Sequence, residues 1–263
     1  LAACDNILEL REDDAGRTAS MHADALKRKS DAYRRQDMME KAIAVLEQGL
    51  KLPGLWQHDR DDLTMQIAER ERDRERYDVA FARAEEVAGR DDADNWRRFR
   101  ARQLQGDIQR RAGKIDEAEK AFRRSLEVER IPDGHKAGVL YTVGEMHREA
   151  GQPDAAIENY DEVLMLAKGN DHWQARALER IAHVMRGQKR SDEAAERLAK
   201  ALQESNLAPR YRTSVLWAMA EAQRDAGMED ALRVTCQTIL ELDANGGHVK
   251  RAQEMLDAMN KKE

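Results

Sequence analysis

The chain has 263 residues, of which 37% are charged and only 5% are aromatic, and its formal net charge is −6. Ala, Leu, Glu and Arg are abundant and there are four prolines, so we expect an all-helical protein without a large sheet. The mild negative charge argues against a general nucleic-acid binder, and no apolar run approaches the roughly 20 residues that a membrane span needs. The two cysteines, Cys4 and Cys236, show no metal-ligand or redox spacing.

The N-terminal residues allow two interpretations. Leu1-Ala2-Ala3-Cys4 has the form of a lipoprotein processing site, after which Cys4 would carry lipid. Alternatively, these residues already belong to a helix, because residues 4–10 closely match residues 236–242 near the other end of the chain. We favour the helix, since a lipoprotein usually continues into a flexible polar linker. The chain begins with Leu1 and not with methionine, so we expect a fragment or a processed product.

A stretch of similar sequence recurs every 38 residues. The segment 144–156 resembles the segment 106–118, and related residues return at 182–194. One series of small residues with this period is Ala42, Ala80, Ala118, Ala156 and Ala194, followed by Leu232. A second series, twelve residues before the first, is Ser30, Ala68, Gly106, Gly144, Ala182 and Ala220. Six units therefore share one period, and their small residues allow two helices to approach closely.

Each unit is predicted to hold two helices. In the fourth unit, Leu140, Val143 and His147 lie on one helical face. Gly151 is expected to end this helix and Pro153 to begin the next, which are the positions that these residue types favour. The fifth unit lacks the glycine, and there we expect the Ser191 side chain to cap the second helix.

The residues Gly144, Ala156 and Tyr160, and likewise Gly106, Ala118 and Phe122, resemble the tetratricopeptide repeat. The resemblance covers nearly the whole chain and implies an all-α, right-handed superhelical solenoid of antiparallel helix pairs. It also implies that the first helices line a concave groove. The chain departs from the family in its period, because the usual repeat has 34 residues, and the extra residues fall in the connections between units.

The ends of the chain are expected to differ from the middle, as stacked repeats require. Residues 1–22 are predicted to be a partial repeat helix and a connection, with residues 15–23 as a polar connection. Residues 23–244 are predicted to form six 38-residue repeats. Residues 245–263 are predicted to hold a capping helix, whose apolar stripe is Val249, Ala252, Leu256 and Met259.

The most informative polar feature is an arginine at the same place in all six first helices. We call these residues the arginine ladder: Arg34, Arg72, Arg110, Arg148, Arg186 and Arg224. Three residues before each arginine lie Asp31, Glu69, Asp107, Glu145, His183 and Glu221. Acid and Arg at this spacing share a helix face and attract. The ladder could pair with acids of its own or the next unit and fix the register, or it could grip a charged or extended peptide.

Another position of the first helices carries Tyr141, Trp217, Met65 and Gln103. By analogy with peptide-binding members of the family, an exposed aromatic side chain there would anchor a partner, and packing between adjacent units is the alternative. The family's peptide clamp of a Lys followed four residues later by Asn is not matched, because Lys27 is followed by Asp31. Binding of chaperone tails is therefore disfavoured.

Other candidate sites are weaker. The segment 96–102 is basic with interleaved aromatics, but three acidic residues precede it, so we interpret it as a solvated helix start. His58, His172 and His248 share one position in the connections of mostly non-adjacent units, so we do not expect a metal site. Cys236 replaces an aromatic of the second helix and is expected to be buried. No nucleophile elbow or phosphate loop is present in the sequence.

The sequence thus predicts a non-enzymatic scaffold without cofactors, which binds a protein or peptide segment on its concave face. The predicted partner-binding residues are Arg72, Arg110, Arg148, Arg186, Glu69, Asp107, Glu145, Tyr141 and Trp217. The alternatives are a lipid-anchored assembly factor of a bacterial envelope and the repeat domain of a larger regulator. We expect a cytoplasmic protein, or a periplasmic or outer-membrane lipoprotein if Cys4 is lipidated. The sequence does not indicate an oligomeric state.

Overall fold

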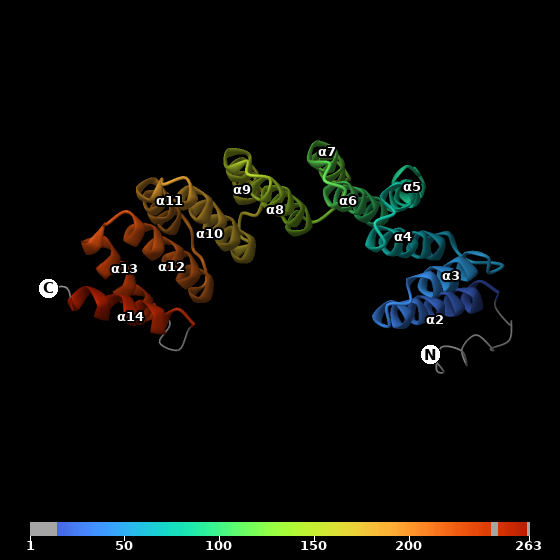
Figure 1. Ribbon diagram of the computed structural model, residues 1–263, viewed down its shortest axis with the longest axis horizontal. Coiled ribbons are helices and arrows are strands. Elements are labelled where there is room, and N and C mark those ends of the chain that lie inside the picture. Colours follow the sequence, from blue (N-terminus) through green and yellow to red (C-terminus); the bar gives the residue numbers. More distant parts are fainter. Residues whose placement is uncertain (1–14, 243–246, 262–263) are drawn as a thin grey trace. The chain divides into compact units, whose positions relative to one another are not determined.

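The computed structural model of the protein describes residues 15–242 and 247–261, and in these ranges every regular element is an α-helix (Figure 1). The all-α prediction is confirmed: these ranges hold thirteen helices and no strand. None of the described helices is long and apolar enough to cross a membrane. Both interpretations of the N-terminus concern Cys4 and its neighbours, which lie outside the described residues.

The first twelve helices form six pairs. The first helices of the pairs are α2 (Ala15–Arg35), α4 (Gln57–Asp73), α6 (Asn95–Arg111), α8 (Asp133–Glu149), α10 (Asp171–Gly187) and α12 (Pro209–Asp225). The second helices are α3 (Met39–Leu50), α5 (Tyr77–Ala88), α7 (Ile115–Leu126), α9 (Pro153–Leu166), α11 (Ser191–Glu204) and α13 (Glu229–Leu242). Each second helix begins 38 residues after the previous one. A single helix, α14 (Val249–Asn260), follows the pairs.

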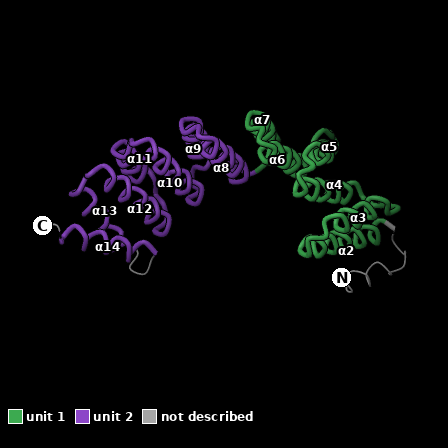
Figure 2. Tube along the Cα trace, in the orientation of Figure 1, with its two compact units in different colours: residues 1–131 green, residues 132–263 purple. Residues whose placement is uncertain are grey.

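The chain divides into two compact units (Figure 2). Unit 1 comprises residues 1–131 and contains α2 to α7, whereas unit 2 comprises residues 132–263 and contains α8 to α14. Within each unit, a second helix packs against the first helix of its own pair and against the first helix of the next pair. Consecutive first helices therefore lie side by side on one face of the unit.

The polar connection expected at residues 15–23 is helical instead, because α2 begins at Ala15. Ala19 and Ala23 are buried in a cluster that includes Leu46 and Leu63. Small side chains at these two positions let the helix backbone approach its neighbours, while the polar residues between them lie on the other side. The prediction of a connection overlooked this narrow apolar stripe.

The periodic small residues lie at the contact between the two helices of a pair. Ala42, Ala80, Ala118 and Ala156 are completely buried. The size of the small residue in the first helix depends on the side chain that it faces in the second helix: glycine lies opposite an aromatic ring. A Cβ atom added at Gly144 would lie 2.5 Å from the Tyr160 ring, and one added at Gly106 would lie 2.6 Å from Phe122. Glycine occurs here because a facing aromatic ring fills the space that a methyl group would occupy.

Every helix pair is joined by the same turn. The N–H groups of Gly151 and Gln152 donate to the carbonyl oxygens of Arg148 and His147, which is the Schellman pattern of hydrogen bonds, and Gly151 has φ +72°. Left-handed residues at the equivalent place in the other pairs are Asp37, Glu75, Gly113, Lys189 and Gly227. As predicted, Gly151 follows the end of α8 and Pro153 begins α9.

Two further predictions concern local details of the second helices. The predicted cap at Ser191 is wrong: Ser191 is the first helical residue and is buried, and Arg190 before it makes no side-chain cap. The left-handed residue one position earlier than Arg190 sets where the helix begins, so Ser191 falls inside it. Cys236 is buried as expected, with its Sγ 4.0 Å from Sδ of Met255 on α14. The predicted C-terminal helix is present, and Ala252 and Leu256 are its buried residues.

Candidate functional site

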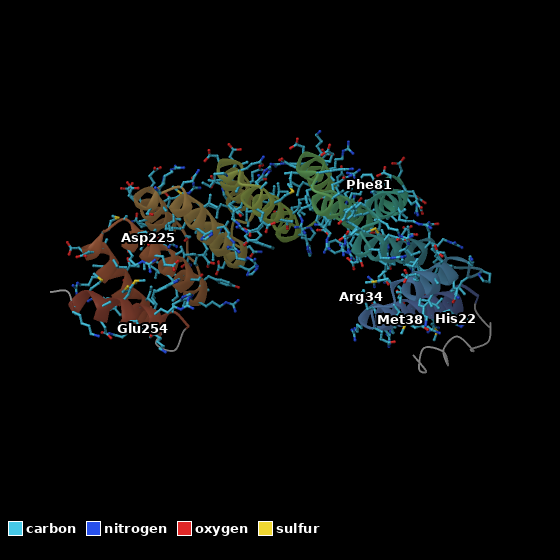
Figure 3. All side chains as sticks on the ribbon, viewed as in Figure 1. His22, Arg34, Met38, Phe81, Asp225 and Glu254 are labelled. Atoms are coloured by element: carbon cyan, nitrogen blue, oxygen red, sulfur yellow. The ribbon has the colours of Figure 1, made fainter. Side chains whose placement is uncertain are left out.

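The arginine ladder lies in the last turn of the first helices. In each pair the backbone carbonyl of the ladder arginine accepts the hydrogen bond from the left-handed residue of the turn, as Arg148 does from Gly151. A cation is favourable at this end of a helix because the carbonyl groups there carry partial negative charge. Arg34, at the end of α2, and Asp225, which ends α12 beside Arg224, are labelled in Figure 3. Local helix chemistry thus already accounts for part of the periodicity.

Every ladder arginine also forms an ion pair with an acidic side chain. The pairs are Arg34–Asp31, Arg72–Asp107, Arg110–Asp107, Arg148–Glu145, Arg186–Glu221 and Arg224–Asp225. The predicted attraction within one helix occurs in three of these pairs. In two others, Arg72 and Arg186, the arginine reaches the acid of the next repeat. These contacts fit the structural interpretation of the ladder, in which it fixes the register of the repeats.

Asp107 is the centre of the ladder in unit 1. Its carboxylate accepts hydrogen bonds from Arg72 at 2.8 Å and from Arg110 at 2.7 Å, and Arg111 lies 3.3 Å away. Burial opposes ionisation of Asp107, but the bond from Arg110 and the three guanidinium charges outweigh it and lower the pKa of the carboxyl group. Glu69, by contrast, lies 3.6 Å from Arg100.

In unit 2, Arg186 donates to Glu221 and to Asp225, each at 2.8 Å. Arg148 lies only near acids of its own helix, 3.1 Å from Glu145 and 3.5 Å from Glu149. The ladder arginines therefore form two groups. Arg72 and Arg186 form ion pairs with acids of the next repeat and so connect neighbouring repeats. The ion pairs described for Arg148 are all with acids of its own helix.

Glu145 and Tyr141 belong to a cluster between α8, α9 and α10. Glu145 accepts a hydrogen bond from the Tyr160 hydroxyl at 2.5 Å and lies 3.1 Å from Nε of Arg180. Arg180 also donates to the Tyr141 hydroxyl at 2.8 Å. Burial and the neighbouring carboxylate of Glu145 raise the pKa of Tyr160.

The Tyr141 side chain is buried, so it is not exposed for contact with a partner. Its ring lies 5.7 Å from the ring of Tyr160 and 5.6 Å from that of Trp173, and the guanidinium of Arg176 lies 4.5 Å above it. These contacts support the packing interpretation at this position. Contact between Tyr141 and a partner remains a prediction that the structure does not favour.

Unit 1 has a pocket of about 370 Å³ between α2, α4 and α6. Its lining includes Lys27, Met65, Glu69, Trp96 and Arg100. Trp96 is 42% exposed and Arg100, one turn later on the same helix, has a side chain that is 53% exposed. The pocket thus combines an accessible aromatic ring with an accessible cation.

Unit 2 has a smaller cavity of about 140 Å³ that includes Trp217, one of the predicted residues. The indole ring of Trp217 is stacked on the imidazole of His248, with ring centroids 5.6 Å apart and planes at 19°. Glu179 also lines this cavity and was missed from the sequence. It occupies the position in α10 that Tyr141 and Trp217 occupy in their helices, so the period alone identifies it.

The segment 96–102 is the beginning of α6, as predicted. The Asp94 side chain caps this helix by accepting a hydrogen bond from the Arg97 backbone N–H at 2.9 Å. Arg97 also pairs with Asp62 of the previous first helix at 2.9 Å, and Phe99 is completely buried. Within residues 15–242 and 247–261, no three His, Cys, Asp or Glu side chains are grouped so that they could hold a metal ion.

Two models of the tetratricopeptide repeat match the chain. One matches residues 136–203 and the other matches residues 23–53 and 99–131, and together they cover half of the chain. No curated protein matches significantly.

Several solved structures have a similar fold. The C-terminal part of a TPR repeat-containing protein from Cytophaga hutchinsonii is 11% identical, with a TM-score of 0.60 over 95% of this chain and 92% of that one. The signal transduction ATPase with a tetratricopeptide repeat sensor from Pyrococcus horikoshii is 17% identical, with a TM-score of 0.54 over 94% of this chain and 43% of that one. PilF of Pseudomonas aeruginosa is 13% identical, with a TM-score of 0.51 over 89% and 97%.

At these identities the solved structures support the fold alone. The family models add the repeat itself, on segments from both units. Together with the six helix pairs and their turns, they show that the chain belongs to the tetratricopeptide repeat family.

Proposed function

We propose that the protein is a non-enzymatic scaffold that holds a segment of a partner protein on its first-helix face. This name denotes the surface formed by α2, α4 and α6 in unit 1 and, separately, the surface formed by α8, α10 and α12 in unit 2. Repeats of this family serve protein–protein interaction, which supports the general class. The choice of face depends on which side chains are still available for a partner.

The ladder arginines are largely engaged within the protein. The side chains of Arg72 and Arg186 are each only 18% exposed, and each already contacts two carboxylates. A partner carboxylate would have to displace these acids from the two guanidinium groups, which would weaken the pairing of the acids. We therefore assign to Arg72 and Arg186, with Asp107, mainly the alignment of neighbouring repeats. Arg110, Arg148, Glu69 and Glu145 retain partial access from the same surface.

The observation that supports the proposal most directly is that Arg100, in the unit 1 pocket, is only weakly paired. Its only ion pair in the described part of the chain is with Glu69 at 3.6 Å, a distance too long for a hydrogen bond. Its guanidinium thus retains its donors for a ligand, and a planar guanidinium suits a carboxylate. The exposed ring of Trp96 beside it offers an apolar contact. The pocket is suited to a partner segment that presents a carboxylate next to an apolar side chain.

Crosslinking from two positions tests this proposal. A photoreactive phenylalanine replaces Trp96 in the pocket or Met165, which is 74% exposed on the second helix α9. We expect a crosslinked partner from position 96 in an extract of the source organism, and little from position 165. The captured chain is then produced and its affinity measured directly.

The affinity measurement uses two matched double variants. W96A/R100A removes the ring and the cation of the pocket, and M165A/K200A removes one apolar and one cationic side chain from exposed sites on second helices. We expect the first variant to weaken binding about tenfold or more and the second to change it less than about twofold. Equal crosslinking from both positions, or unchanged binding by W96A/R100A, would contradict the proposal.

A further inference from the structure

The cavity in unit 2 differs in its charge from the pocket in unit 1. It lies between α10, α12 and the residue before α14, and its lining includes Glu179, His183, Arg186, Trp217, Glu221 and His248. A volume of about 140 Å³ corresponds to roughly five water molecules, which is room for one side chain and not for a larger element.

Glu179 is the notable group in this cavity. It is partly buried, yet within residues 15–242 and 247–261 it has neither an ion pair nor a hydrogen bond. The other nearby carboxylates, Glu221 and Asp225, share the guanidinium of Arg186. Partial burial makes an unpaired carboxylate unfavourable, so a cation that reached Glu179 would gain more there than at an exposed acid.

The charges around the cavity favour the entry of a cation. Besides Arg186, Arg251 lies 6.0 Å from the centre of the Trp217 ring. Of the charged side chains that line the cavity itself, Glu179 and Glu221 outnumber the single guanidinium of Arg186, which leaves one negative charge in excess. Asp225 lies outside this lining and is paired with Arg224 as well as with Arg186. Trp217 forms one wall of the cavity, and an indole ring favours both a cation and the aliphatic stem that carries it.

We propose that this cavity binds a lysine or arginine side chain of the partner segment. The charged head pairs with the Glu179 carboxylate, and the methylene stem lies against Trp217. This inference rests on the proposed function, because it names the side chain that the first-helix face selects in unit 2. Unit 1 selects a carboxylate at Arg100, so the two units select opposite charges.

Fluorine NMR on the full chain tests the inference without the partner. All four tryptophans are replaced by 5-fluorotryptophan, and the W217F variant assigns the resonance of Trp217. The probes are Nα-acetylarginine amide, its lysine counterpart, and Nα-acetylcitrulline amide, which resembles the arginine compound but is neutral. We expect the two cationic compounds to shift the Trp217 resonance saturably and the citrulline compound to bind at least about tenfold more weakly.

Two conservative variants add a second readout. E179Q keeps the shape of the side chain and removes its charge, and we expect it to weaken binding of the arginine compound about tenfold. E196Q changes an exposed residue of α11 and is expected to bind as the unmodified chain does. Equal binding of the citrulline compound, or unchanged binding by E179Q, would overturn the inference. The citrulline comparison uses the unmodified chain, so it holds even if a variant folds poorly.

The outcome separates this inference from the proposed function. If a partner crosslinks at position 96 but the arginine compound does not shift the Trp217 resonance, only the inference that the unit 2 cavity binds a basic side chain is refuted. Binding of the arginine compound at Trp217, with no partner crosslinked at position 96, would contradict the scaffold assignment and leave the cation site intact.

Discussion

Ion pairs connect the first helices in both units, but in the described part of the chain only unit 2 adds an aromatic cluster to them. In unit 1, consecutive first helices are connected by guanidinium–carboxylate pairs: Arg70–Asp31, Arg97–Asp62 and Arg72–Asp107. In unit 2, α8 and α10 are connected by an aromatic cluster around Tyr141 together with the Arg180–Glu145 ion pair, and α10 and α12 are connected by Arg186. The helix pairs and turns are otherwise alike.

This difference shows which features of the repeat are fixed and which vary. Small residues inside the pair and a left-handed residue in the turn determine how the helices pack, and they recur in both units. One equivalent position of the first helices carries Met65 and Gln103 in unit 1 but Tyr141, Glu179 and Trp217 in unit 2. Function is therefore expected to vary with these side chains and not with the fold.

The largest effect is expected from a methyl group at the contact inside a pair. Gly144→Ala in unit 2 and Gly106→Ala in unit 1 place a Cβ within 2.6 Å of an aromatic ring, and each should lower the free energy of unfolding by about 1–3 kcal/mol. Gly187→Ala is the control, because no atom lies within 4 Å of the added Cβ, and it should be neutral or slightly stabilising. Urea unfolding measures all three. Equal effects at positions 144 and 187 would refute the packing argument.

The next effect separates ladder arginines that cross between repeats from those that do not. Arg186→Ala leaves Glu221 and Asp225 without their shared partner and should cost about 1–2 kcal/mol of unfolding free energy. Arg148→Ala should cost about 0.5 kcal/mol or less, because Glu145 keeps Tyr160 and Arg180. Both arginines occupy the same place at the end of a helix, so the helix-end contribution cancels in the comparison. A larger loss from Arg148→Ala would contradict the assignment.

Much of this organisation follows from the sequence. The period of 38 residues is visible in the sequence, and Gly151 and Pro153 mark the end of one helix and the start of the next by their residue types. The family resemblance covers nearly the whole chain. The Schellman turns at Asp37, Glu75 and Lys189 were not predicted, because these residue types do not by themselves indicate a left-handed conformation. The turn is nevertheless retained where glycine is absent.

The candidate site was predicted less well, for a physical reason. The sequence shows that Arg72 and Arg186 recur, but their ion pairs join residues 35 positions apart, and only the stacking of repeats brings these residues together. The sequence left open whether the ladder fixes the register of the repeats or binds a partner, and the ion pairs between repeats fit the first interpretation. Arg100 has no comparable sequence signal, because only the structure shows that its ion pair with Glu69 is long. Glu179 shares the periodic position of Tyr141 and Trp217, but the sequence does not show that it is unpaired within the described residues.

A smaller effect concerns the pH dependence of stability in unit 1. The folded pKa of Asp107 is lowered, so its contribution is fully present above its unfolded pKa of about 4 and is lost as the pH falls through the folded value. Asp107→Asn should therefore lower the unfolding free energy by about 1 kcal/mol at pH 7. The difference from the unmodified chain should shrink steadily below about pH 4. A difference that stays constant down to acid pH would show that the charge of Asp107 is not the stabilising feature.

The smallest effect tests the turns shared by both units. Glu75→Gly in unit 1 and Lys189→Gly in unit 2 relieve a left-handed conformation, with φ of 61° and 63°, and should each stabilise the chain by about 0.5–1 kcal/mol. Gly151→Ala should destabilise it by about 1 kcal/mol for the same reason. Thermal unfolding of the three variants provides the measurement. Destabilisation by either glycine substitution would mean that the side chain contributes more than the strain costs.

The central claim is that the ladder aligns the repeats and that the pocket beside it binds the partner. A pair of variants tests both halves in one experiment: R72A/R186A removes the ladder arginines that cross between repeats, and W96A/R100A removes the pocket side chains. The measurement is the midpoint of thermal unfolding together with the affinity for the crosslinked partner, taken at a temperature where both variants are folded.

We predict that R72A/R186A unfolds at a lower temperature but binds the partner within about threefold of the unmodified chain. We predict that W96A/R100A keeps its unfolding midpoint and loses about tenfold or more in affinity. The reverse result, a stable ladder variant that no longer binds beside a pocket variant that binds normally, would contradict the account.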